Sequence, residues 1–380
     1  MPSRGLRQER LVPARRLVVK VGTALLTRPA GQGPGLDLDF IRELAQQIGA
    51  LTKRGYWITL VSSGAVGAGC AELGLDKRPD DVAELQAVAA VGQRRLMTHL
   101  HDALEPHGLH VGQLLLTRQD FDNRERFLNI RNCVTKLHTM GCLAVLNEND
   151  SVAVEEIRFG DNDLLAALTT NALAAEALII LTTVDGLLDE TGQVVDLVDD
   201  VTDRIGLVRA SRGGWGSGGM GTKLEAARLV TEAGEVAVIA PGKPKSSTDQ
   251  DGVLLRIMAG EQVGTFFQPA EQRMDSRSRW IGLTKRPDGT LTVDAGASRA
   301  VTDAGKSLLA KGITDVTGRF ERGGLVVVRD PHGREIGRGL INYSATETRA
   351  IMGHDSSEFA EILKQPGFAE VIHRDNLVVM

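Results

Sequence analysis

The chain has 380 residues, more than one ordinary domain contains, so its length predicts two or three domains. Of these residues 42% are hydrophobic, only 4% are aromatic and 43 are glycine, as in α/β proteins built from aliphatic side chains and tight turns. The formal charge of −5 gives no sign of a nucleic-acid-binding protein, and no apolar run approaches the roughly 20 residues that span a bilayer. Three cysteines without paired spacing indicate neither a disulfide framework nor a zinc site, and they favour a reduced, cytoplasmic setting.

The N-terminal segment is basic, but the apolar run that follows it is too short for a signal peptide. We expect residues 1–15 to be a disordered extension. The next run, Leu17 to Val21, predicts a buried strand that contains Lys20. A lysine there is costly unless it meets an anion, so Lys20 is either a phosphate clamp or a solvent-facing lysine of an edge strand.

A helix across 41–51, ending at Gly55, leads to a second strand from Trp57 to Val61. That strand runs into the motif VSSGAVGAG, which contains Ser63. Its hydroxyl groups and glycines form either a cradle for a carboxylate or phosphate, or a turn that lets a helix pack closely against the strand.

Helices and strands continue to alternate along the chain. Further helices are predicted over 85–104 and after Asp163, with strands over 111–116, 143–146 and 178–181. Strands separated by helices of ten or more residues pair in parallel, with helices on both faces. The sequence therefore predicts a three-layer α/β sandwich with a mainly parallel sheet.

Two acidic motifs follow predicted strands: NEND, from Asn147 to Asp150, and GDND, from Gly160 to Asp163. Such clusters bind a divalent cation or an ammonium group, hold lysines in place, or serve only as caps and turns. Because ligands of parallel sheets gather beyond the carboxyl ends of the strands, we expect these motifs to form one composite site.

The stretch GSGGMGTK, from Gly216 to Lys223, is typical of a phosphate-binding loop followed by a helix, although a flexible linker has a similar composition. Thr222 and Glu225 have the spacing of a capping box, which places the start of the helix at the loop. The order Gly221-Thr222-Lys223 differs from the Gly-Lys-Ser/Thr of P-loop enzymes and disfavours that class.

Together, two lysines, two glycine-rich motifs and two carboxylate-amide clusters suit phosphoryl transfer, in which positioning and charge neutralisation supply most of the catalysis. A carboxylate acceptor fits this inventory, because at a solution pKa of about 4.3 it is already ionised and needs no general base.

Beyond Pro269 the pattern changes to short alternating runs separated by turn signals, as in a small, mostly-β domain. We predict a kinase-like domain over 16–267, a linker over 268–278 and the second domain over 279–380. Residues 275–380 carry 15 Lys and Arg against 14 Asp and Glu, so their net charge gives no support for RNA binding.

Nearly the whole chain resembles the bacterial glutamate 5-kinases, members of the amino acid kinase family joined to a C-terminal PUA domain. The resemblance is carried by VVKVGTALLT, VSSGAVGAG, AVGQRRLM, GQLLLTRQDF, RERFLN, NENDSVA, GDNDLLAAL and GSGGMGTKLEAA. It implies ATP-dependent phosphorylation of the γ-carboxylate of L-glutamate to L-glutamyl 5-phosphate, the first step of proline biosynthesis, with feedback inhibition by proline.

The resemblance also implies roles for particular residues. Lys20 and Lys223 neutralise the transferring phosphoryl group, and Asp163 orients the two lysines. Glutamate is bound by Ser63, Asn147, Asp150 and Asn162, with Asp150 facing the substrate ammonium. ATP is bound by Lys20, Thr182, Thr183, Ser217, Gly218, Gly219, Met220, Gly221, Thr222 and Lys223. Mg²⁺ is expected to ride on the ATP phosphates, with no metal site of the protein's own.

One departure from the family is visible after the strand LIILTT. Many relatives carry Thr-Asp there, whereas this chain has Thr182-Thr183 and its nearest acid is Asp185. The sequence therefore leaves open which side chain meets the nucleotide at this position.

The resemblance implies a homo-oligomer, either dimer or tetramer, and coupling to a glutamate-5-semialdehyde dehydrogenase. Its alternatives are another amino acid kinase, an RNA-binding protein acting through the PUA domain, and a catalytically inactive homologue. Another amino acid kinase is disfavoured because this chain has Gly22-Thr23 where those kinases usually carry Gly-Gly. The near-zero net charge of the PUA region counts against an RNA-binding protein. The presence of Lys20, Asp163 and Lys223 counts against an inactive homologue.

Overall fold

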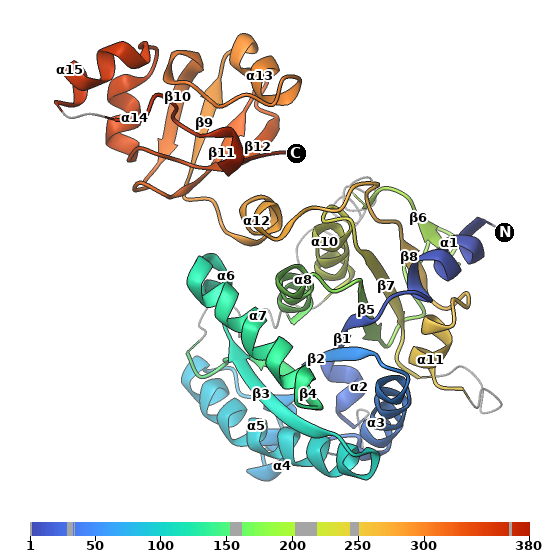
Figure 1. Ribbon diagram of the computed structural model, residues 1–380. Coiled ribbons are helices and arrows are strands. Elements are labelled where there is room, and N and C mark those ends of the chain that lie inside the picture. Colours follow the sequence, from blue (N-terminus) through green and yellow to red (C-terminus); the bar gives the residue numbers. More distant parts are fainter. Residues whose placement is uncertain are drawn as a thin grey trace. The chain divides into compact units, whose positions relative to one another are not determined.

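A computed structural model gives the fold of the chain (Figure 1). The residues that it describes are 2–28, 33, 35–152, 162–201, 219–243, 251–364 and 367–380. They form two compact units, one of residues 1–120 with 125–273 and the other of residues 121–124 with 274–380. Each unit is considered by itself.

The first unit is built on an eight-stranded sheet with the order β3-β4-β2-β1-β5-β7-β8-β6. The strands are β1 (Arg16–Val21), β2 (Trp57–Ser62), β3 (His110–Leu116), β4 (Cys142–Glu148), β5 (Ala177–Thr182), β6 (Leu197–Val198), β7 (Val236–Pro241) and β8 (Thr265–Phe267). Every pairing is parallel except that of β7 with β8. The predicted mainly parallel sheet is confirmed.

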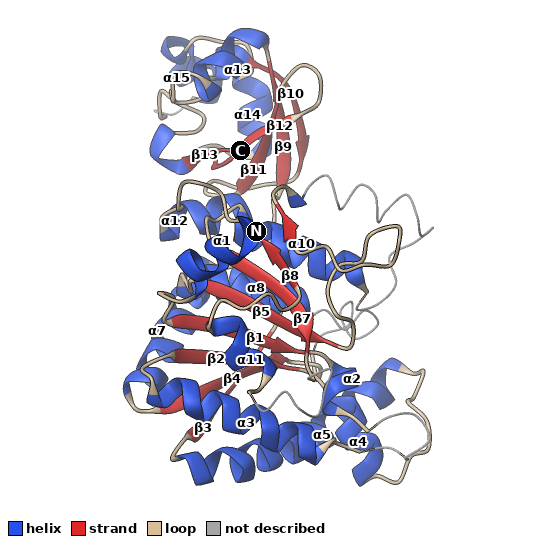
Figure 2. Cartoon of the chain, turned by 90° about the vertical axis from the view of Figure 1, so that its right-hand side faces the viewer, coloured by secondary structure: helices blue, strands red, loops and turns tan. Residues whose placement is uncertain are grey.

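Helices cover both faces of this sheet, which gives the expected three layers (Figures 1 and 2). On one face lie α7 (Arg124–Thr139), α8 (Asn162–Leu173) and α10 (Met220–Thr231), and α6 (Arg118–Asp122) connects β3 to α7. On the other face lie α2 (Thr23–Leu26), α3 (Leu38–Lys53), α4 (Ala65–Glu72), α5 (Val82–Leu104) and α11 (Val253–Met258). The strand and helix predictions made from periodicity correspond to β1 to β5, α3, α5 and α8.

The alternation of side chains along β1 places Lys20 at the site. Leu17, Val19 and Val21 are buried in the core shared with α3, whereas Lys20 points to the opposite face, which α8 covers. Because β1 pairs with β2 on one side and β5 on the other, and Lys20 is only 5% exposed, the edge-strand alternative for this lysine is wrong.

The expectation of a disordered N-terminal extension is wrong for most of its length, because residues 2–11 form helix α1 (Pro2–Leu11). Leu11 is fully buried in the core, and the guanidinium of the equally buried Arg7 donates hydrogen bonds to Asp196, Val263 and Gly264. A buried arginine needs hydrogen-bond acceptors of this kind. The sequence of so short a segment does not predict them, because they lie far away along the chain.

Two glycines allow α4 and α5 to cross with their backbones in contact. A Cβ atom on Gly69 would stand 1.9 Å from the carbonyl oxygen of Val88, and one on Gly92 would stand 1.8 Å from that of Ala65. The glycines of VSSGAVGAG therefore include one required for close packing, as one of the two readings of that motif anticipated.

The second unit contains a five-stranded sheet with the order β10-β9-β11-β12-β13. Its elements are α12 (Ser276–Arg279), β9 (Gly289–Val293), α13 (Ala295–Thr302), β10 (Ile313–Gly318), β11 (Leu325–Arg329), β12 (Glu335–Leu340), α14 (Ala345–Ile351), α15 (Phe359–Leu363) and β13 (Leu377–Val379). Its core contains Leu291, Val326 and Tyr343. The prediction of a small, mostly-β domain is confirmed.

Candidate active site

Two lysines from different elements converge on one buried carboxylate at the carboxyl end of the sheet. Lys20 Nζ of β1 lies 2.6 Å from Asp163 Oδ1, and Lys223 Nζ of α10 lies 2.9 Å from Asp163 Oδ2. The side chains of the three residues are 1 to 8% exposed. Two cations thus share the Asp163 carboxylate, and the three side chains carry a net charge of +1 between them.

Burial by itself raises the pKa of Asp163, but the charges of Lys20 and Lys223 outweigh it and hold that pKa below its usual range. Asp163 is therefore ionised at neutral pH. It stands in the first turn of α8, where the helix dipole also favours a negative charge.

Helix α10 presents its N-terminus to the same cluster. Its N-cap is Gly219, and Thr222 lies inside the first turn, with its hydroxyl 2.8 Å from Asp163 Oδ2 and 2.9 Å from the Gly219 carbonyl oxygen. The predicted capping box of Thr222 and Glu225 is therefore wrong, because the glycine backbone begins the helix three residues earlier. The first N–H groups of a helix have no partner within the helix, so this turn is suited to bind phosphate.

A cavity of about 610 Å³ is lined by the expected glutamate-binding side chains, among them Asn162, the residue before Asp163. Within it, Asn162 Nδ2 donates to Ser63 Oγ at 2.9 Å and to Asn147 Oδ1 at 3.1 Å. These three side chains are 2 to 7% exposed. Asn162 Oδ1 is buried without a hydrogen-bond partner among the described residues, so it remains available to a donor on a ligand.

Asp150 lines the same cavity at the end of β4. Burial raises its pKa to about 6, against an opposing effect of the nearby Arg78. A carboxyl group in this condition gains from a cationic partner, because an ammonium group beside it restores the charge that burial disfavours.

The residues expected to bind nucleotide are only partly described. Thr182 ends β5, and the exposed Thr183 follows it. Ser217 and Gly218 lie outside the described residues. A second cavity of about 330 Å³ opens beyond the ends of β5 and β7, and Asp185, Pro241 and Lys243 are among its lining residues, whereas Thr183 is not. After β5 it is therefore Asp185, and not Thr183, that lines this smaller cavity.

Within the described ranges, no three His, Cys, Asp or Glu side chains gather into a group that could hold a metal ion. In the same ranges no helix has the length and apolar character needed to cross a membrane.

Sequence reasoning missed three residues at this site: Gln93, Arg78 and Lys243. Gln93 of α5 accepts a hydrogen bond from Asn147 Nδ2 at 2.7 Å, and Arg78 lines the cavity with Asp150. The motif AVGQRRLM contains Gln93, but helical periodicity assigns that position to a packed helix face, so the only signal was a polar residue among alanine and valine.

The chain was compared with known proteins. The model of the amino acid kinase family matches residues 15–240, and that of the PUA domain matches residues 289–363. A glutamate 5-kinase of Syntrophotalea carbinolica is 46% identical over 98% of this chain and 100% of its own length. The chain belongs to the glutamate 5-kinase family.

Other members of the glutamate 5-kinase family are similarly close. The enzyme of Synechococcus sp. (strain JA-3-3Ab) is 45% identical over 96% of this chain and 98% of its own length. Among solved structures, a carbamate kinase of Giardia covers 68% of this chain at 17% identity with a TM-score of 0.48. The family match spans both units, because its members align with the chain from end to end.

Proposed function

We propose that this protein transfers the γ-phosphoryl group of ATP to the γ-carboxylate of L-glutamate, forming L-glutamyl 5-phosphate, the first step of proline biosynthesis. The observation that carries the proposal is the pair Lys20 and Lys223 held on Asp163 beside a cavity lined by amides and a carboxylate. The relatives that match the chain over their whole length are glutamate 5-kinases.

In the proposed reaction an oxygen of the ionised γ-carboxylate forms a bond to the γ-phosphorus as the bond from phosphorus to the ADP oxygen breaks. No proton moves in this step, because the carboxylate is already ionised near neutral pH and the leaving group departs as an anion. Lys20 and Lys223 offset the negative charge that gathers on the transferring group, and Asp163 keeps them in place until substrate arrives.

Glutamate is proposed to lie in the larger cavity, bound by Ser63, Asn147, Asp150 and Asn162. Its ammonium group fits beside Asp150 and the partnerless Asn162 Oδ1, both of which accept hydrogen bonds. ATP is proposed to place its phosphates at the N-terminus of α10, along Gly219 to Lys223, and its base in the smaller cavity beyond β5 and β7.

Mg²⁺ is proposed to arrive on the ATP phosphates, as the resemblance to the family implies. We also propose the cytoplasm as the protein's location, assembly into a dimer or tetramer, coupling to glutamate-5-semialdehyde dehydrogenase and inhibition by proline, on the strength of membership in the family.

The test is ATP turnover with L-glutamate and hydroxylamine, which converts an acyl phosphate into a stable hydroxamate. Aspartate and N-acetylglutamate serve as controls, because they separate the neighbouring amino acid kinase activities. Hydroxamate from glutamate alone is the expected result. Its absence with every acceptor, in protein that still binds ATP, would exclude the proposed reaction.

A further inference from the structure

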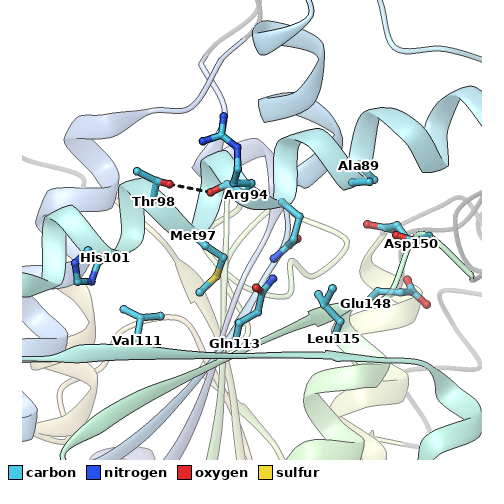
Figure 3. A pocket seen from close by; sticks show the side chains of 13 residues that line it. Ala89, Arg94, Met97, Thr98, His101, Val111, Gln113, Leu115, Glu148 and Asp150 are labelled. Atoms are coloured by element: carbon cyan, nitrogen blue, oxygen red, sulfur yellow. Dashed lines mark hydrogen bonds between the residues drawn. The ribbon is translucent and has the colours of Figure 1, made fainter.

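A third cavity, also of about 610 Å³, lies between helix α5 and the edge strand β3 (Figure 3). It is called the outer cavity here, and the glutamate pocket the inner one. Met97 and Thr98 of α5 face Gln113 and Leu115 of β3 across it. Gln93 lines this outer cavity, and its side-chain oxygen reaches Asn147 of the inner one. With an exposed fraction of 9%, Gln93 forms part of the wall between the two cavities.

The hydrogen bonds of Asn147 have a direction that a backbone group fixes. The N–H of Glu148 donates to Asn147 Oδ1 at 2.9 Å, and a backbone N–H can only donate. The opposite end of the Asn147 amide must therefore be its NH₂ group, which donates to Gln93 Oε1 at 2.7 Å.

This direction passes to the rest of the pocket. Because Asn147 Oδ1 accepts, Asn162 must donate from Nδ2, and the same nitrogen uses its second hydrogen on Ser63 Oγ. The Ser63 oxygen is thus an acceptor within the network, so its own hydroxyl hydrogen is left to donate to a ligand. The remaining oxygen of Asn162 is left to accept.

We propose that Gln93 is a positioning residue, which sets the donor and acceptor pattern of the glutamate pocket through Asn147 without touching the substrate. Its acceptor oxygen keeps the Asn147 amide from turning over, and a turned amide would oppose two NH₂ groups, those of Asn147 and Asn162. The inference rests on the proposed function, because it assigns the resulting pattern to glutamate.

The fold holds Gln93 firmly enough for this role. Its neighbour Gly92 allows the backbones of α4 and α5 to touch, since a Cβ there would stand 1.8 Å from the Ala65 carbonyl oxygen. The position of Gln93 along the helix is therefore fixed from the side of α4, which itself follows the Ser63 segment.

The test compares steady-state kinetics of Gln93→Leu with those of the wild type in the hydroxamate assay. Loss of one buried hydrogen bond is expected to raise the KM for glutamate about tenfold and to leave the KM for ATP within about twofold.

Gln113→Leu is the matched control, because it removes a glutamine amide from the same outer cavity at a position with no hydrogen bond to Asn147. Its glutamate KM is expected to equal that of the wild type. Gln93→Met, which keeps an unbranched side chain and also lacks an acceptor, replaces the leucine variant if that protein does not fold, as judged by its thermal melt.

The outcomes separate the two proposals. A wild-type protein that yields no hydroxamate overturns the proposed function. A wild-type protein that yields it, with Gln93→Leu or Gln93→Met showing the kinetics of Gln113→Leu, overturns the role of Gln93. An equal rise in the KM for ATP and for glutamate shows a packing role and also overturns it.

Discussion

Replacing Asp163 by asparagine removes the anion that two buried lysines share. At contact distances of 2.6 and 2.9 Å, each pair gains about 6 kcal/mol of gross Coulomb energy at an effective dielectric constant of about 20. Much of that gain offsets desolvation, and removing one partner of a buried pair costs roughly 3–5 kcal/mol net. We therefore expect Asp163→Asn to lower the free energy of unfolding of the first unit by about that amount.

The measurement is differential scanning calorimetry at neutral pH. A loss of roughly 3–5 kcal/mol corresponds to a fall in Tm of about 5–9 °C for a unit of about 270 residues, at about 2.1 cal/mol/K of unfolding entropy per residue. Asp39→Asn is the control, because Asp39 also pairs with one cation, Arg42, but both side chains are more than 60% exposed. Such a pair contributes less than about 1 kcal/mol, so the control is expected to melt with the wild type.

ATP provides a second, independent readout. In Asp163→Asn the two lysines lose the carboxylate that they share, so saturating ATP is expected to raise the Tm of the variant by more than it raises that of the wild type. The pKa of Asp163 is lower in the folded protein than in the unfolded chain, where it lies near 4. The ionised Asp163 therefore stabilises the fold above about pH 4, and this stabilisation is lost as the pH falls through the folded-state pKa. A variant that melts within about 2 °C of the wild type, or an equal ATP shift in both proteins, would refute this reasoning.

Three further predictions concern single side chains. Lys20→Ala and Lys223→Ala are each expected to lower kcat at least a hundredfold while leaving a folded protein by circular dichroism, and near-normal turnover would remove that lysine from the mechanism. Burial raises the pKa of Asp150 to about 6, because it acts more strongly than the opposing charge of Arg78. We therefore expect kcat/KM for glutamate to fall below pH 6, and Asp150→Asn to abolish this pH dependence. A wild-type profile that is flat from pH 5 to 8 would contradict this prediction. Arg7→Ala is expected to cost at least about 2 kcal/mol in urea unfolding, since it leaves several buried carbonyl oxygens without donors, and an unchanged midpoint would show that α1 is dispensable.

The sheet and its chemistry could be predicted from the sequence because they depend on local patterns. Apolar runs of four to six residues between amphipathic helices specified the parallel strands, and the charge inside one of them marked Lys20. The rule that polar motifs meet at the carboxyl ends of parallel strands predicted one composite site there. That Lys20 and Lys223 meet on Asp163 was implied by the resemblance to the glutamate 5-kinases.

What the sequence did not predict depends on partners distant in the chain. Arg7 is buried because Asp196 and the backbone near Val263 receive its hydrogen bonds, and nothing in residues 1–15 encodes those partners. In the sequence Gln93 is one polar position on a predicted helix, and its hydrogen bond with Asn147, 54 residues away, is visible only in the structure. The helix start at Gly219 rather than Thr222 was missed because a glycine backbone can cap a helix without any side-chain signal.

Asn162 and Asp163 are joined by a single peptide bond in the first turn of α8, and they serve different halves of the site. One holds the amides of the glutamate pocket, and the other holds the lysines of the phosphoryl group. Binding of either glutamate or ATP orders this turn for the other substrate as well, so we expect each to bind more tightly when the other is bound. Thermodynamic reciprocity makes the two increases in affinity equal. A low concentration of either substrate therefore also lowers the enzyme's apparent affinity for the other.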